Sequence, residues 1–230
     1  MKQTAVAPKS ERVIQWLKPF VELVYAPLGV DVDALCDRIY ALIEPRVEKI
    51  RTRYIERWTQ DDVWLITYGD SVVAQESEKP LEILYRVLET YLKDTITGVH
   101  ILPFFPYSSD DGFAVIDYLQ VNPDLGDWDE IQAIAQQFDL MTDVVINHAS
   151  SQNQWFLEFQ QGQKPGCDYF MTVDPSTDLS DVVRPRNTPL LCPVETPAGT
   201  KHVWATFSHD QIDLNFANPD VLIECLKIIL

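Results

Sequence analysis

The sequence predicts an α/β fold built on a parallel sheet, and two observations carry that prediction. Residues 61–148 alternate in the order strand, helix, strand, helix, strand. The three strands are apolar on both faces, which is typical of a parallel sheet covered by helices. Right-handed crossovers are therefore expected between successive strands.

Residues 1–60 are expected to form a helical extension. Apolar residues in 10–25 recur close to the helical period, and the sequence APLG at 26–29 ends this first helix. A second helix is expected to start from a cap at Asp31 or Asp33. Pro45 lies inside its apolar pattern, so the helix should kink or give way to an abutting one there. Nothing in the extension indicates chemistry.

Residues 61–148 hold the predicted sheet. The strands are expected at VWLITY, at ITGVHIL and at DLMTDVVINH, and the third of these ends in Asn147 and His148. One helix is expected to start near Pro80, and another is expected to be capped by Asp127. No G-x-G-x-x-G or G-x-x-x-x-G-K-[ST] pattern occurs, so a phosphate-cradling nucleotide loop is absent from the sequence.

Residues 149–216 interrupt this alternation with prolines, glycines and no long helical stripe. They are too long for a plain connection, and we expect an inserted subdomain after the third strand. Residues 217–230 should form a final helix that begins at Pro219 and returns to the sheet domain.

Composition excludes several functional classes. The 230 residues carry 18 Lys and Arg against 35 Asp and Glu, a net charge of −17. Such a surface repels nucleic acids and anionic membranes, although its simplest role is solubility. No apolar run approaches the roughly 20 residues of a membrane span, and the N-terminus lacks a signal-peptide core. The four Cys show no metal-ligand spacing. A soluble, cytoplasmic protein without a cofactor is expected.

Polar and aromatic side chains gather where the predicted strands end. Tyr68 follows the first strand, Asp110 and Asp111 lie in the loop after the second, and His148 ends the third. The carboxyl ends of parallel strands share one rim, so these groups should converge. A single His at a strand end is more often structural than functional. Carboxylates, an imidazole and aromatic faces together suit a sugar, which presents hydroxyls at its edge and C–H groups on its faces.

Several motifs resemble one known family in order and spacing. DVVINH at 143–148 resembles the first signature of the α-amylase superfamily, glycoside hydrolase family 13, and QIDLN at 211–215 resembles its short signature after the third strand. ITYGD, GVHILPFFPYSSDDGFAVIDYLQVNPDLGDWDEI and VVRPR resemble the sucrose phosphorylase and glucosylglycerate phosphorylase branch. The resemblance runs from about residue 61 to the end of the sequence. It implies a partial (β/α)8 TIM barrel containing the first three βα units.

The resemblance also implies roles for particular residues. Asp110 and His148 would hydrogen-bond the glucosyl group, Tyr68 would lie near the sugar, and Phe113 and Phe156 would wall the pocket. Arg186 would help to hold phosphate, which suits a guanidinium fork, although a surface or salt-bridged Arg is an equal alternative. Asn147 matches a calcium ligand of some relatives. The phosphorylase branch generally works without metal, so no metal is expected.

The family's catalytic carboxylates do not appear in this sequence. A retaining mechanism uses a nucleophile and an acid–base carboxylate about 5 Å apart. The family's nucleophile lies in a G-x-R-x-D pattern, which is not found here. We therefore expect the front part of a larger α-glucosyl phosphorylase, inactive alone, that takes an α-glucoside such as sucrose or glucosylglycerate together with inorganic phosphate.

Two alternatives stay open at this point. One is a hydrolase or transglucosylase of the same superfamily. The other is a non-catalytic sugar-binding or assembly module. An uncovered barrel face would also favour self-association or association with a missing C-terminal part.

Overall fold

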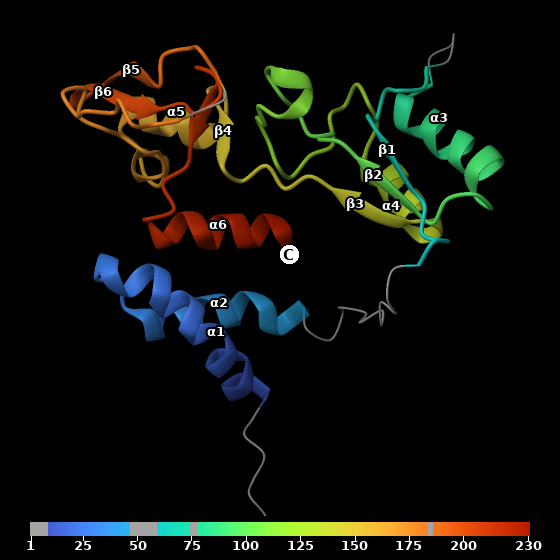
Figure 1. The fold of residues 1–230 in the computed structure, drawn as a ribbon, viewed down its shortest axis with the longest axis horizontal. Helices are drawn as coiled ribbons and strands as arrows, with labels where there is room; N and C mark the ends of the chain where they lie inside the picture. Colours follow the sequence, from blue (N-terminus) through green and yellow to red (C-terminus); the bar gives the residue numbers. More distant parts are fainter. Residues whose placement is uncertain (1–8, 47–58, 74–77, 184–185) are drawn as a thin grey trace, which may run out of the picture. The chain divides into compact units, whose positions relative to one another are not determined.

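The computed structural model describes residues 9–46, 59–73, 78–183 and 186–230 (Figure 1). These residues form two compact units. The first holds helices α1 (Lys9–Tyr25), α2 (Val32–Ile43) and α6 (Pro219–Ile229). Among the described residues, the second holds every strand and the remaining α-helices, and it also holds all the residues to which a function is assigned above.

The first unit is a small helical assembly with its own core. Side chains of α1, α2 and α6 are buried together; they are Val21, Tyr25, Leu35, Cys36, Ile39 and Ile223. The Asp31 carboxylate accepts a hydrogen bond from the Ala34 amide at 3.0 Å, which confirms Asp31 as the helix cap. Helix α2 ends at Ile43, and a short 3-10 turn, Glu44–Arg46, contains Pro45. The expected continuation of this helix lies outside the described residues.

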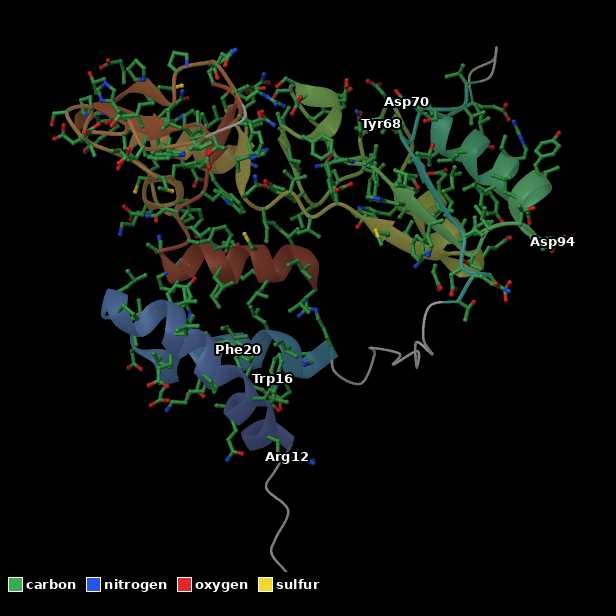
Figure 2. The ribbon with its side chains drawn as sticks, in the orientation of Figure 1. Arg12, Trp16, Phe20, Tyr68, Asp70 and Asp94 are labelled. Carbon is green, nitrogen blue, oxygen red and sulfur yellow. The ribbon has the colours of Figure 1, made fainter. Side chains whose placement is uncertain are left out.

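One face of α1 is apolar and open to solvent. Trp16 and Phe20 project from this face (Figure 2), with 68% and 56% of their surface exposed. Their ring centroids lie 5.3 Å apart. The opposite face of α1 carries Val21 and Tyr25 into the core, so this helix is apolar on both sides.

A three-stranded parallel sheet organises the second unit. Strands β1 (Trp64–Thr67), β2 (Gly98–Ile101) and β3 (Asp139–Thr142) lie in the order β1-β2-β3. Helix α3 (Pro80–Val87), which continues as a π-helical turn through Leu92, connects β1 to β2. Helix α4 (Trp128–Gln137) precedes β3 and is capped by Asp127, whose carboxylate forms the capping box with Glu130. The predicted cap at Asp127 is thereby confirmed.

The two faces of this sheet differ in burial. Val99 and Ile101 are fully buried on one face, together with Leu81, Leu84 and Ile134 of α3 and α4. On the other face, Ile66 pairs in register with His100, and His100 pairs in register with Met141. Ile66 is 64% exposed and Met141 is 46% exposed, so helices cover only one face within the described residues.

The third strand is shorter than predicted. It ends at Thr142, and His148 begins a separate strand, β4 (His148–Ser150). Strand β4 pairs antiparallel with β7 (Gln211–Asp213), so the prediction of one strand over 139–148 is wrong. The reason lies in the intervening residues. The Asn147 carbonyl accepts from the Leu214 amide at 3.0 Å, which draws the chain away from the parallel sheet and toward β7.

The remaining elements of the second unit follow β4. Helix α5 (Gln154–Gln161) is capped by Asn153, and strands β5 (Leu191–Thr196) and β6 (Gly199–Trp204) form an antiparallel hairpin. The sequence analysis does not predict this hairpin. Figure 1 shows α5, β4 and the hairpin grouped together, joined to the parallel sheet by the segment that follows β3. No helix among the described residues is long and apolar enough to span a membrane.

Candidate functional site

A pocket of about 510 Å³ lies in the second unit and gathers most of the predicted site residues. Tyr68, Asp110, Phe113, His148 and Arg186 line it together. The rest of its lining comprises Asp111, Asp143, Val144, Val145, Asn147, Phe207 and Gln211, of which the sequence analysis singled out only Asp111 and Asn147. The structure therefore brings together groups that lie up to 143 residues apart in the sequence.

Tyr68 reaches the pocket because it directly follows β1. Figure 2 shows Tyr68 and Asp70 at the end of that strand. The Tyr68 amide donates to Ser71 Oγ at 3.1 Å, and Thr67 Oγ donates to the Tyr68 carbonyl at 3.0 Å. These local bonds turn the chain at the strand end and hold the half-buried Tyr68 ring at the pocket wall.

Asp110 lies in a loop with an unusual backbone. Asp110 and Asp111 have φ values of 58° and 49°, and Gly112 has φ of 106°. Left-handed backbone costs an L-residue roughly 1–2 kcal/mol, although Asp tolerates it better than most. A Cβ at position 112 would lie 2.5 Å from the Pro103 carbonyl oxygen, so only glycine fits there. This conformation places the exposed Asp110 and Asp111 side chains at the pocket.

His148 is buried beneath the pocket, with only 4% of its surface exposed. Its Nε2 lies 2.9 Å from the Phe113 carbonyl oxygen, which can only accept, so Nε2 carries the hydrogen. Its Nδ1 accepts from Asn147 Nδ2 at 2.8 Å. We assign the neutral Nε2–H tautomer from these two contacts. Burial lowers the pKa of His148, and this outweighs the opposing effects of the Phe113 carbonyl and the charges of Asp213 and Asp110.

Gln211 lies between the two polar residues that the sequence analysis placed at the centre of the site, and it hydrogen-bonds Asp110. Its Nε2 donates to Asp110 Oδ2 at 2.9 Å and lies 3.2 Å from His148 Nε2. Its Oε1 accepts from Ser208 Oγ at 3.0 Å, which fixes the orientation of the amide. Gln211 is 2% exposed. Sequence reasoning missed it, although it is the first residue of the QIDLN motif.

Phe207 supplies an aromatic surface beside His148. The two ring centroids lie 5.3 Å apart, and the Arg186 guanidinium carbon lies 5.9 Å from the Phe207 centroid. Arg186 is exposed and also lines an adjoining pocket of about 540 Å³. A cation over an aromatic ring is a favourable arrangement, so Phe207 helps to direct Arg186. No sequence motif used above singled out Phe207.

Phe156 does not line this pocket, and we correct its predicted position. Phe156 is 2% exposed on α5. Its ring stacks on Phe159 with centroids 5.6 Å apart, and Phe170 contacts it edge-on at 5.0 Å. Phe156 therefore contributes to an aromatic core. Phe207, and not Phe156, lines the pocket.

The chemistry of the pocket suits a neutral ligand with several hydroxyl groups. The Asp110 and Asp111 carboxylates can accept hydrogen bonds, Arg186 can donate them, and Phe113 and Phe207 offer apolar faces. A ligand hydroxyl that approached His148 Nε2 would share its hydrogen with the Phe113 carbonyl. In the part of the chain that the structure describes, no three His, Cys, Asp or Glu side chains form a group that could hold a metal.

Comparisons with known proteins agree with the fold and the motifs. Residues 88–229 match the sequence profile of the alpha-amylase catalytic domain. The chain belongs to the alpha-amylase catalytic-domain family. Within that family it is similar to the glucosylglycerate phosphorylases of Allomeiothermus silvanus and Spirochaeta thermophila, as the motifs predicted. The identities are 52% over 75% of the chain and 53% over 74% of the chain.

A solved structure shows the same fold. The crystal structure of sucrose 6F-phosphate phosphorylase from Thermoanaerobacter thermosaccharolyticum matches 76% of this chain and 38% of its own, with a TM-score of 0.66 and 31% identity. The described residues thus share part of the fold of the alpha-amylase-like TIM-barrel family. The chain spans 31% and 29% of the length of the two glucosylglycerate phosphorylases.

Proposed function

We propose that this chain is part of a retaining α-glucosyl phosphorylase and supplies residues that bind the glucosyl group. The observation that carries the proposal is the pocket in which Gln211 donates to Asp110 Oδ2 and lies 3.2 Å from His148 Nε2, so that both polar residues face the same space. The two most similar relatives named above are glucosylglycerate phosphorylases, which favours glucosylglycerate over sucrose as the α-glucoside. In the proposed reaction the glucosyl group passes to inorganic phosphate with retention, giving α-glucose 1-phosphate.

Roles within the site follow from the contacts. Asp110 would accept hydrogen bonds from glucosyl hydroxyls, and His148 would donate from Nε2. Phe113 and Phe207 would pack against the apolar faces of the ring. Arg186 would meet phosphate, since it is exposed and lies where the two adjoining pockets share a wall.

We also propose how the chain fits a complete barrel. Strands β1, β2 and β3 with their helices would be the first three βα units, and residues 149–216 would be the inserted subdomain. The parallel order β1-β2-β3 supports this arrangement. The cytoplasmic location remains a prediction from the sequence.

The chain alone should not turn over substrate, since its sequence contains no G-x-R-x-D pattern. Two measurements on the purified 230-residue chain test the proposal. Calorimetry with glucosylglycerate should show saturable binding that the His148→Ala variant loses. An assay with glucosylglycerate and phosphate should yield no glucose 1-phosphate. Absence of sugar binding would refute the binding role, and phosphate-dependent release of glucose 1-phosphate would refute inactivity.

A further inference from the structure

A carboxylate outside the proposed sugar contacts is surrounded by three serine hydroxyls. Asp210 Oδ2 accepts from Ser108 Oγ at 2.6 Å and from Ser109 Oγ at 2.5 Å. Asp210 Oδ1 accepts from Ser151 Oγ at 2.5 Å and from the Ser151 amide at 3.3 Å. Two donors thus approach each oxygen. An ionised carboxylate offers about four acceptor positions, so this set leaves little capacity for a ligand.

These hydrogen bonds join three segments that are distant in sequence. Ser108 and Ser109 directly precede Asp110, Ser151 directly follows strand β4, and Asp210 directly precedes β7. The Asp210 carbonyl also accepts from the Ser151 amide at 3.1 Å, and Ser108 Oγ lies 2.6 Å from Ser150 Oγ. One side chain therefore connects the Asp110 loop to both strands that carry His148 and Gln211.

The loop that Asp210 holds has a conformation that needs external support. Asp110, Asp111 and Gly112 all have positive φ, and such backbone persists only where surrounding contacts determine it. The loop's own backbone hydrogen bonds lie at its two ends. The Ser108 amide donates to the Ala114 carbonyl at 3.0 Å, the Ala114 amide donates to the Ser109 carbonyl at 3.2 Å, and the Phe113 amide donates to the Asp110 carbonyl at 3.0 Å.

We propose that Asp210 is a positioning residue that fixes residues 108–110 against β4 and β7 and thereby sets where the Asp110 carboxylate stands in the pocket. The identity of the group that Asp110 then contacts rests on the proposed function. The charge state of Asp210 agrees with this role. Burial raises its pKa, but the hydrogen bonds from Ser108, Ser109 and Ser151 outweigh burial and lower the net pKa.

Hydrogen exchange tests the positioning role without any sugar. Amide exchange over 108–114 should be measured by mass spectrometry in the wild-type chain, in Asp210→Ala and in Asp210→Asn. The alanine variant should exchange faster over 108–114, because the anchor is lost. The asparagine variant should stay near wild type, because its amide oxygen accepts from serines and its NH2 donates to a serine oxygen.

Asp174→Ala is the matched control. Asp174 accepts from the Ser176 amide and hydroxyl at 2.8 Å and 2.6 Å, in the same unit, but it does not line the pocket. The Asp174→Ala variant should therefore leave amide exchange over 108–114 unchanged. The proposal is overturned if Asp210→Ala exchanges like wild type there, or if Asp174→Ala accelerates the same amides. Unchanged exchange in α5 would show that the Asp210 variants are folded.

Sugar binding then connects the positioning role to the proposed function. Calorimetry with glucosylglycerate should give a Kd raised about tenfold or more in Asp210→Ala, and within about threefold of wild type in Asp210→Asn. If the wild-type chain binds and Asp210→Ala binds equally well, Asp210 does not position Asp110. If the wild-type chain fails to bind, the proposed function fails, and the exchange measurement still decides the role of Asp210.

Discussion

Gln211 donates a hydrogen bond to Asp110 across 2.9 Å, although the two residues are separated by 100 others in the sequence. One lies on the short strand β7, and the other lies in the left-handed loop after β2. The same amide nitrogen approaches the His148 ring. The pocket therefore depends on the second unit being folded as a whole, and on no single strand end.

The Gln211→Ala variant should weaken both folding and sugar binding. Gln211 is buried, and its loss would remove hydrogen bonds to Asp110 and Ser208, at a cost of about 1–3 kcal/mol in the free energy of unfolding. Urea unfolding and calorimetry with glucosylglycerate would measure the two effects. Gln163→Ala, at an exposed position of the same unit, is the control and should change neither. A Gln211→Ala chain with wild-type affinity would contradict the assigned role.

The Gly112→Ala variant should destabilise the second unit more than Gly199→Ala. Both glycines have positive φ, 106° and 99°, so the backbone strain is matched. A Cβ at 112 would lie 2.5 Å from the Pro103 carbonyl oxygen, whereas a Cβ at 199 would meet nothing within 4 Å. We expect Gly112→Ala to lower the urea midpoint clearly and Gly199→Ala to cost only about 1 kcal/mol. Equal midpoints would show that the loop relaxes around the added methyl group.

His148 should make the stability of the second unit depend on pH. Burial lowers its pKa below the ordinary value of 6.5, so the unfolded chain binds the proton more readily than the folded chain. The contribution is fully present above pH 6.5 and is lost as the pH falls toward the lowered pKa of the folded protein. Urea midpoints should therefore decline over that range in wild type and stay flatter in His148→Gln. An equal decline in wild type and His148→Gln would contradict a contribution from His148. The control is His209→Gln, at an exposed position, whose midpoints should decline as in wild type.

The structural role of Phe156 and the pocket position of Phe207 can be separated by mutation. Phe156→Ala should cost about 3–5 kcal/mol in the free energy of unfolding, because it empties a position between Phe159 and Phe170. Phe207→Ala should cost less and should weaken glucosylglycerate binding, because Phe207 lies against His148 at the pocket. Urea unfolding and calorimetry on both variants decide this. If Phe156→Ala keeps its stability but loses affinity, our correction is wrong.

The starts of several helices could be predicted from sequence because their signals are local. Asp31 and Asp127 cap the helices expected of them, and Pro80 begins α3. Each of these signals acts within one helical turn, so no distant part of the chain is needed to read it.

The break between β3 and β4 could not be predicted in this way. DVVINH looks like a continuous buried strand, yet His148 pairs with Asp213 in β7, and only the tertiary fold brings those residues together. Phe207 and Gln211 were missed for the same reason. Gln211 begins the QIDLN motif, but the motif alone does not say which of its side chains faces the pocket, and no motif marks Phe207. Gln211 lies in the strand that pairs with β4, and both residues line the pocket.

Cys225 should resist alkylation until the first unit unfolds. Burial, followed by the charge of Glu224, raises the pKa of its thiol to about 11, and only the thiolate is nucleophilic. At pH 8, iodoacetamide should label the half-buried Cys192 before Cys225, as mass spectrometry of peptides would show. Labelling of Cys225 at the same rate in native and urea-unfolded chains would mean that the core of α1, α2 and α6 opens readily.

Within the described residues, β1 and β3 are the outer strands of the parallel sheet, and each has one neighbour. Any further strand that annealed to either of them in parallel would run in the same direction. Its last residues would arrive at the rim where Tyr68 already stands. A strand added at either edge of the sheet would therefore place the side chains at its carboxyl end beside the pocket. Each added strand would thus supply both more sheet and more side chains that could contact a ligand.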